Sequence, residues 1–133
     1  MKAKAKILLV DDDPDFLEIH KTILEKHNYQ ALTATSAEEG LMRVRTDMPD
    51  LIVLDLIMEK HDAGFSFSKR VKTDPLFKKI PILMVTSVAE STGYRFSLEE
   101  DGYWMKVDDF IDKPVKPEVL LKKVSCLLKK YKE

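Results

Sequence analysis

Residues that could do chemistry follow the short apolar runs of this 133-residue sequence, each at the carboxyl end of its run. Asp11 and Asp12 follow the first run, Asp55 the third, Thr86 the fourth, and Lys113 closes the fifth. Carboxylates that lie close together repel one another, and protonation or a bound cation must relieve this repulsion. A set of oxygen ligands without His or Cys favours Mg2+, whose coordination is usually completed by a phosphate oxygen. These residue types therefore indicate phosphoryl chemistry at a magnesium site.

In that chemistry each of these residues has a distinct role. We expect Asp55 to attack phosphorus as a nucleophile and to form an acyl phosphate. Lys113 and Mg2+ would neutralise the phosphoryl oxygens, and the Thr86 hydroxyl would donate a hydrogen bond to one of them. The fold must then bring side chains that are far apart along the chain into one pocket.

The apolar runs predict the elements that would do so. Runs of strand length cover residues 7–10, 30–34, 51–54, 82–85 and 109–111. The first, third and fourth are continuous rather than alternating, which is typical of parallel strands buried on both faces. With helices between the strands, the sequence predicts an α/β fold, a doubly wound five-stranded parallel sheet in three layers, α/β/α. Such sheets bind ligands at the carboxyl ends of their strands.

The start of the first helix is marked by Asp13 and Pro14, which predict an N-cap followed by a proline in the first turn. We expect this helix to run to about residue 27. Its inward-facing residues are predicted to be Phe16, Ile19 and Ile23.

The other helices are predicted in the same way. A capping box that begins at Ser36 opens the second helix, and Pro49 ends it. We expect a third helix that is preceded by Gly64 and runs to about Thr73, a fourth between Ala89 and Lys106, and a last one from Pro117. The residues expected to face the core are Ala37, Leu41, Val44 and Met48 in the second helix, Phe67 and Val71 in the third, and Leu120, Val124, Leu127, Leu128 and Tyr131 in the last.

The composition of the chain argues against several classes of protein. Hydrophobic residues make up 44% of the chain, enough for one core, so we expect a single domain over residues 1–133 without an output domain. A formal net charge of -1 gives no basis for binding nucleic acid directly or an anionic membrane. The single cysteine, Cys126, excludes an internal disulfide and is expected to pack inside. Because there is neither a signal peptide nor an apolar stretch of about 20 residues, we expect a cytoplasmic protein.

Four motifs of the sequence, taken together, resemble those of the receiver domain of bacterial response regulators. They are Val10-Asp11-Asp12-Asp13-Pro14, Val53 to Met58, Pro81 to Thr86, and Asp112-Lys113-Pro114. Each motif alone is weak, but the four occur in the family's order at the predicted strand ends, and the resemblance covers nearly the whole chain. It implies a flavodoxin-like sheet with strand order 2-1-3-4-5.

The resemblance also implies roles for individual residues. Asp55 matches the phosphoacceptor, and Lys113 matches the family's catalytic lysine, whose bond to the following proline is cis in relatives. Thr86 and Phe110 match the switch hydroxyl and the switch aromatic. The implied Mg2+ ligands are Asp11, Asp12, Asp55 and the backbone carbonyl of Ile57.

The implied function is that of a phosphorylation-activated switch in a two-component system or phosphorelay, and not of an enzyme acting on other molecules. A sensor histidine kinase or a histidine phosphotransferase would donate the phosphoryl group. Because no output domain is expected, the signal would pass to a separate downstream protein.

Three other functions remain open. In a haloacid-dehalogenase-like phosphatase, Asp11 and Asp13 would form the catalytic D-x-D pair and Asp108 and Asp109 the later acidic pair, but Asp55 would then be unused. A flavodoxin-type cofactor binder would need a glycine or threonine cluster after the first strand to hold a phosphate. A degenerate receiver would bind proteins without being phosphorylated, although the complete acidic set argues against it.

Overall fold

The computed structural model describes residues 5–55, 63–87 and 109–132, which form one sheet and the helices that cover it. The elements along the chain are β1 (Lys6–Val10), α1 (Pro14–Lys26), β2 (Gln30–Ala34), α2 (Ala37–Asp47), β3 (Leu51–Asp55), α3 (Ala63–Thr73), β4 (Ile82–Ser87), β5 (Asp109–Lys113) and α5 (Pro117–Lys132). The five strands are all parallel and lie in the order β2-β1-β3-β4-β5. The predicted fold and strand order are confirmed.

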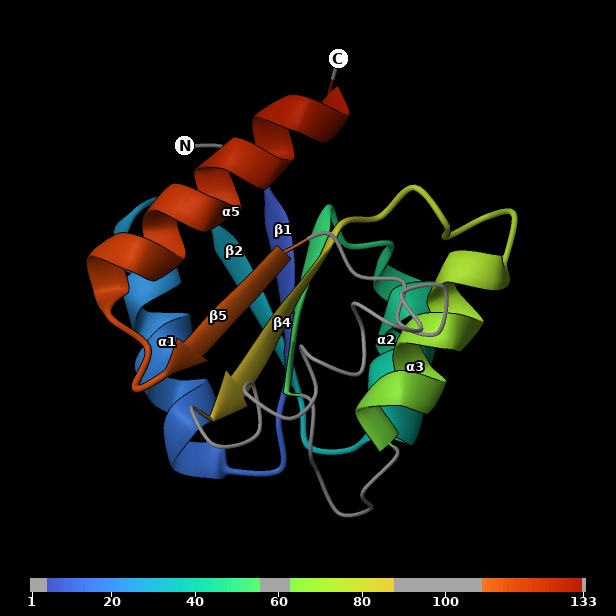
Figure 1. Ribbon diagram of the computed structural model, residues 1–133, viewed down its shortest axis with the longest axis horizontal. Coiled ribbons are helices and arrows are strands. Elements are labelled where there is room, and N and C mark those ends of the chain that lie inside the picture. Colours follow the sequence, from blue (N-terminus) through green and yellow to red (C-terminus); the bar gives the residue numbers. More distant parts are fainter. Residues whose placement is uncertain (1–4, 56–62, 88–108, 133) are drawn as a thin grey trace.

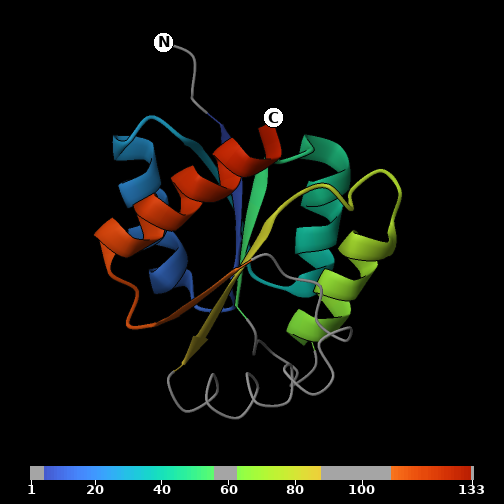
Figure 2. The ribbon, with the colours of Figure 1, turned by 45° about the horizontal axis from the view of Figure 1, so that its top comes forward.

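The sheet is the middle of three layers. Helices α1 and α5 cover one of its faces, and α2 and α3 cover the other (Figures 1 and 2). Successive strand residues alternate between two cores, because side chains of a strand point to opposite faces. The α2/α3 core contains Leu8, Val10, Ile52, Leu54, Ile82 and Met84. The α1/α5 core contains Ile7, Leu9, Leu51, Val53, Leu83 and Val85.

The predicted caps are present at the starts of α1 and α2. The Asp13 carboxylate accepts a hydrogen bond from the backbone N–H of Asp15 at 3.0 Å, which satisfies one of the unpaired donors of the first turn. The Ser36 hydroxyl accepts one from the N–H of Glu39 at 3.1 Å, and the Glu39 carboxylate accepts one from the N–H of Thr35 at 2.6 Å. These caps fix where each helix leaves the carboxyl edge of the sheet.

The predicted inward face of α1 is wrong by one residue. Ile19 is 57% exposed and Phe16 and Ile23 are only partly buried, whereas Leu17, His20 and Leu24 are buried. Two apolar stripes run side by side on this helix, and spacing alone did not distinguish them.

Burial of His20 is possible because its ring nitrogen Nδ1 lies 2.8 Å from the Phe16 carbonyl oxygen. A carbonyl oxygen only accepts hydrogen bonds, so Nδ1 is the donor and the buried polar atom is satisfied.

Three smaller expectations also differ from the structure. Met48 is 51% exposed because α2 ends at Asp47 and Met48 takes the left-handed conformation, with φ of 47°. Helix α3 begins at Ala63, so Gly64 lies inside it. Cys126 is exposed on α5. The helix predicted between Ala89 and Lys106 lies outside the described residues.

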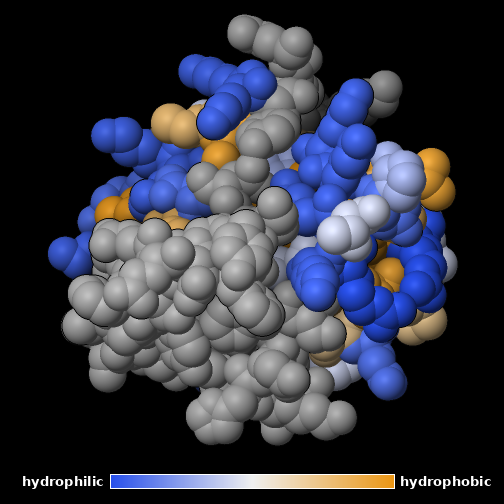
Figure 3. Space-filling view, turned by 45° about the vertical axis from the view of Figure 1, so that its right-hand side comes forward, coloured by the Kyte–Doolittle hydropathy of each residue, from blue (hydrophilic) through white to orange (hydrophobic). Residues whose placement is uncertain are grey.

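The exposed apolar side chains are scattered. Among the described residues, the large ones are Ile19, Met42, Met48 and Leu76. On the face seen in Figure 3, the coloured surface is mostly hydrophilic with separate hydrophobic spots. Within the described ranges, none of the helices has the length and apolarity needed to cross a membrane.

At Gly40, helix α2 lies close to side chains of β1 and α3. A Cβ atom built on Gly40 would lie 2.8 Å from Cε2 of Phe67 and 3.1 Å from Cγ2 of Val10. Both of these side chains are buried, so neither has free space into which it can move. A residue without a side chain is therefore needed for α2 to pack this closely on β1 and α3.

We predict that Gly40→Ala lowers the free energy of unfolding by about 1 kcal/mol, because overpacking of about 1–3 kcal/mol exceeds the gain in helix propensity of about 1 kcal/mol. Urea unfolding measures the change. Phe67→Leu in the same chain should recover part of the loss in a double-mutant cycle, and Glu38→Ala on the exposed side of α2 serves as control. A Gly40→Ala protein at least as stable as the wild type contradicts this packing.

Candidate functional site

The acidic residues predicted to act together lie at the carboxyl edge of the sheet. Asp11 and Asp12 directly follow β1, and Asp55 is the last residue of β3. The chain passes from β1 to β2 on one side and continues through β3 on the other, so the strand order reverses between β1 and β3. Parallel α/β sheets bind ligands at such a reversal, because the flanking loops diverge there and leave a crevice.

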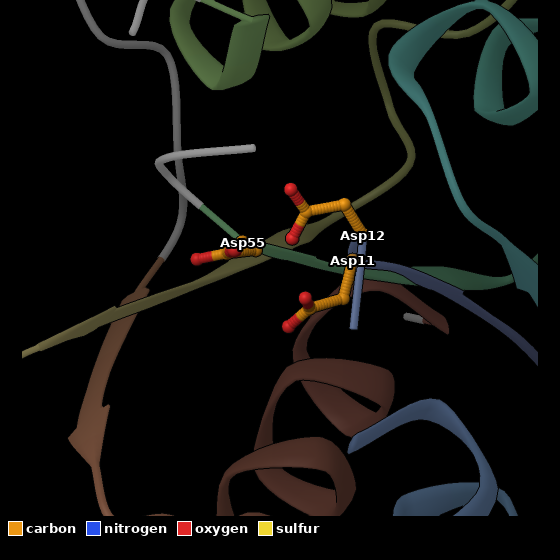
Figure 4. Close-up of side chains that lie close together, drawn as sticks. All are labelled: Asp11, Asp12 and Asp55. Carbon is orange, nitrogen blue, oxygen red and sulfur yellow. The ribbon is translucent and has the colours of Figure 1, made fainter. Parts of the chain in front are cut away.

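The three carboxylates form one compact cluster. One oxygen of each of Asp11, Asp12 and Asp55 can be chosen so that all three lie within 4.8 Å of one another, and Figure 4 shows the side chains close together. Asp11 and Asp55 are buried, at 1% and 4% exposure, whereas Asp12 is exposed. The cluster is therefore dry on one side and open to solvent on the other.

In the part of the chain that the structure describes, Lys113 at the end of β5 is the cation that reaches this cluster. Its Nζ lies 3.8 Å from Oδ2 of Asp11 and 3.7 Å from Oδ1 of Asp55, while 35% of its side chain is exposed. Both distances are ion-pair distances that exceed hydrogen-bond length. Among the described residues, Lys113 brings one ammonium to three carboxylates, so these four side chains together carry an excess of negative charge when they are ionised.

Burial places an electrostatic penalty on ionised Asp11. Burial raises the pKa of the Asp11 carboxyl above its usual 3.8, and the neighbouring Asp12 and Asp13 raise it further. The hydrogen bond from the Asp13 N–H to Oδ1, at 2.9 Å, and the charge of Lys113 lower this pKa only in part. Within the described residues, the other oxygen, Oδ2, is buried and accepts no hydrogen bond.

The cluster fits a hard divalent cation. All the donors are carboxylate oxygens, one of them is buried without a hydrogen bond, and the exposed Asp12 leaves a side open to water. Mg2+ prefers one or two carboxylates and retains several waters, which agrees with this arrangement. Asp11, Asp12 and Asp55 are the described residues that would hold it.

The remaining predicted site residues are described in part. The backbone of Thr86 pairs with that of Asp112 between β4 and β5, at the same edge of the sheet as Asp55. Phe110 is partly buried and packs against the α2/α3 core. The bond between Lys113 and Pro114 is cis, as the resemblance implied. The backbone carbonyl of Ile57 and the side chain of Thr86 lie outside the described part of the chain.

Two acids that the phosphatase alternative requires are used elsewhere. Asp13 is exposed and caps α1. Asp109 accepts hydrogen bonds from the N–H of Phe110 at 2.8 Å and from Lys123 Nζ at 3.0 Å. It lies at the start of β5, at the opposite end of that strand from Lys113. The geometry therefore favours the set built on Asp55.

Sequence reasoning missed one side chain beside the site. The Phe16 ring lies under Lys113, with Nζ at 5.1 Å from the ring centroid. The spacing of apolar residues assigned Phe16 to the core, and no local pattern links it to a residue so far along the chain.

Comparison with known proteins agrees with this geometry. The family described as the response regulator receiver domain matches residues 7–125. The protein PilH of Pseudomonas aeruginosa is 32% identical over 127 residues, which cover 93% of this chain and 98% of PilH. The crystal structure of the chemotaxis response regulator CheY4 of Vibrio cholerae is similar with a TM-score of 0.78 and 28% identity, covering 96% of this chain and 99% of CheY4.

A longer relative matches over part of its length. The alkaline phosphatase synthesis transcriptional regulatory protein PhoP of Bacillus subtilis is 34% identical over 125 residues, which cover 94% of this chain but 49% of PhoP. The chain thus spans nearly all of PilH and about half of PhoP.

The raised pKa of Asp11 gives a prediction for metal-free protein. The folded state binds this proton more tightly than the unfolded chain, so the Asp11 contribution to the free energy of unfolding falls as the pH rises above about 4. Asp11→Asn abolishes this loss, because the amide is neutral and its oxygen still accepts from the Asp13 N–H. Urea unfolding in the presence of a chelator measures this effect. The free energy of unfolding of the variant, relative to that of the wild type, should increase as the pH rises from about 4 to 7.

The control for this prediction is Glu25→Gln, which removes an exposed carboxyl from α1. Its stability relative to the wild type should change little over the same range. If the Asp11→Asn protein instead becomes less stable relative to the wild type as the pH rises, ionised Asp11 is stabilised by the fold.

Proposed function

The chain belongs to the response regulator receiver domain family, the phosphorylation-activated switches of two-component signalling, and we propose that its phosphoacceptor is Asp55. The observation that carries this proposal is the meeting of Asp55 with Asp11, Asp12 and Lys113 at the carboxyl edge of the sheet. Of the three carboxylates, Asp55 alone lies within a strand, at the centre of the sheet. A nucleophile in that place is held rigidly.

The reaction transfers one phosphoryl group to Asp55. A carboxylate oxygen of Asp55 forms a bond to phosphorus while the bond from phosphorus to the donor's leaving atom breaks, and the leaving group departs with the electron pair. The product is an acyl phosphate. Asp11, Asp12 and Asp55 would hold Mg2+, which when bound would neutralise part of the phosphoryl charge.

Lys113 stabilises the charge that the phosphoryl group brings. Its Nζ is within ion-pair distance of both Asp55 and Asp11 but at hydrogen-bond distance from neither, so its N–H donors can turn to a phosphoryl oxygen. An ammonium placed before the reaction starts stabilises developing negative charge without a cost of reorganisation.

The proposed switch couples Asp55 to the edge of the sheet. Strands β3, β4 and β5 are neighbours in the sheet, so Thr86 lies on the strand next to that of Asp55. In the register of β4 and β5, Phe110 pairs with Met84. In our proposal the phosphoryl group draws the Thr86 hydroxyl inward, and Phe110 rotates into the space released. Phosphorylation then shifts the population between two arrangements of β5 and its surroundings.

The partners follow from this chemistry. Receiver domains exchange phosphoryl groups with histidine kinases or phosphotransferases and act on downstream targets; we propose a sensor histidine kinase or histidine phosphotransferase as the donor and a separate protein as the target. Catalysis is limited to the protein's own phosphorylation and dephosphorylation. Direct binding to nucleic acid or to a membrane is not part of the proposal, and the proposed location is the cytoplasm.

We predict that incubation with acetyl phosphate and Mg2+ adds the mass of one phosphoryl group to the intact protein. The label should disappear in Asp55→Asn, because the amide is not a nucleophile. Intact-protein mass spectrometry, followed by peptide mapping, measures both results. Asp50→Asn is the matched control: Asp50 precedes β3, is exposed, and accepts a hydrogen bond from the Lys6 N–H at the other end of the strand.

Each other outcome selects an alternative. A label that survives Asp55→Asn refutes the assignment of the phosphoacceptor. Continuous release of phosphate from a stable phosphate ester revives the phosphatase, and a wild-type protein that never becomes labelled is a degenerate receiver.

A further inference from the structure

Lys113 has an aromatic neighbour that the phosphoryl chemistry does not use. Its Nζ lies 5.1 Å from the centroid of the Phe16 ring, within the range in which a cation is attracted to the face of an aromatic ring. The lysine side chain is 35% exposed and lies beyond hydrogen-bond distance from both Asp11 and Asp55. Ion-pair attraction alone would leave this long side chain free to sample many rotamers and to swing into solvent.

The ring itself is held in place. Phe16 lies in the first turn of α1, directly after the capped start of the helix, and packs against the α1/α5 core. Its centroid is 4.0 Å from that of His20, and the planes are tilted by 30°. His20 is buried, and its Nδ1 donates to the Phe16 carbonyl oxygen at 2.8 Å. The ring therefore presents a fixed surface to Lys113.

We propose that Phe16 is a positioning residue for phosphoryl acceptance, which holds the Lys113 ammonium over its ring beside Asp11 and Asp55. His20, whose ring centroid lies 4.0 Å from that of Phe16, supports the ring. The proposal rests on the proposed function, since it assigns Phe16 to the same phosphoryl site.

An aromatic ring suits this position better than a further acid would. A third carboxylate beside Lys113 would hold the ammonium but would also neutralise it and add to the repulsion among the acids. The ring attracts the cation through its quadrupole and leaves its full charge available to a phosphoryl oxygen. The ring also excludes water from one side of Nζ, which strengthens the pull of the two carboxylates.

The competing explanation is that Phe16 only covers the core. A leucine would cover nearly the same apolar surface, and a core role would be insensitive to the electron density of the ring. The two roles therefore differ in their dependence on ring electrostatics, which can be changed without changing ring shape.

The first experiment compares rates of labelling by acetyl phosphate and Mg2+. Phe16→Leu should slow labelling about 2- to 5-fold, the effect of losing a partly exposed cation–π contact, and Phe16→Tyr should restore it. Tyr29→Leu is the matched control, because it removes a buried aromatic residue from the same core near the amino end of β2, away from the site. It should lower stability and leave the rate unchanged.

The decisive series places 4-fluoro-, 3,5-difluoro- and 3,4,5-trifluorophenylalanine at position 16. Each fluorine weakens the negative face of the ring while its shape is nearly kept. The labelling rate should fall stepwise along the series, while the melting temperature stays unchanged. A rate that does not respond to fluorination overturns the proposal, and so does a Phe16→Leu protein that is labelled as fast as Phe16→Tyr.

A readout without phosphorylation separates this proposal from the function on which it rests. In NMR spectra recorded without a phosphoryl donor, the ring should shift the ε-methylene protons of Lys113 upfield, and Phe16→Leu should remove this shift. If the shift is absent in the wild type, the positioning role fails whatever the labelling shows. If it is present but the wild type is never labelled, the proposed function fails and Phe16 no longer positions a catalytic lysine.

Discussion

The repulsion among three carboxylates at one edge of a parallel sheet is the constraint on which the rest of this structure depends. One oxygen each of Asp11, Asp12 and Asp55 lie within 4.8 Å of one another, and of the described residues Lys113 brings its ammonium to them. Such a cluster costs stability, because burying two of its acids removes their carboxylates from water. In the proposed function, the negative charge of the cluster attracts Mg2+ to the place where Asp55 would accept a phosphoryl group.

The two apolar cores of the fold offset this cost in stability. Strands β1 and β3, which carry the acids, are buried along almost their whole length, and both faces of the sheet are covered by helices. Rigid strands fix the positions of Asp11 and Asp55, while the less constrained side chains, Asp12 and Lys113, keep contact with solvent. The buried side of the site is thus fixed and its exposed side can adjust, which suits the proposed acceptance of a phosphoryl group.

The sequence allowed the fold and the acidic cluster to be predicted because both follow from one-dimensional patterns. Continuous apolar runs identify buried parallel strands, and parallel strands bring the residues at their carboxyl ends together. The face of α1 was wrong because Leu17 and Ile19 belong to two apolar stripes that spacing cannot rank. Met48 was wrong because the left-handed residue that ends α2 is not marked by glycine.

The contact between Phe16 and Lys113 could not be predicted, since it depends on how the start of α1 packs beside the end of β5. Residues that support a site from a neighbouring element leave no motif of their own. The same is true of His20, whose burial depends on a hydrogen bond to its own helix.

A magnesium titration of the melting temperature tests the central claim most directly. The account predicts that Mg2+ stabilises the wild type progressively, because a cation that binds only the folded state adds RT ln(1 + [Mg2+]/Kd) to its stability. In Asp12→Asn, which alters the exposed acid and leaves the buried pair unchanged, most of this response should be lost while the melting temperature in chelator stays close to that of the wild type. Equal stabilisation of both proteins by Mg2+, or none in either, would contradict it.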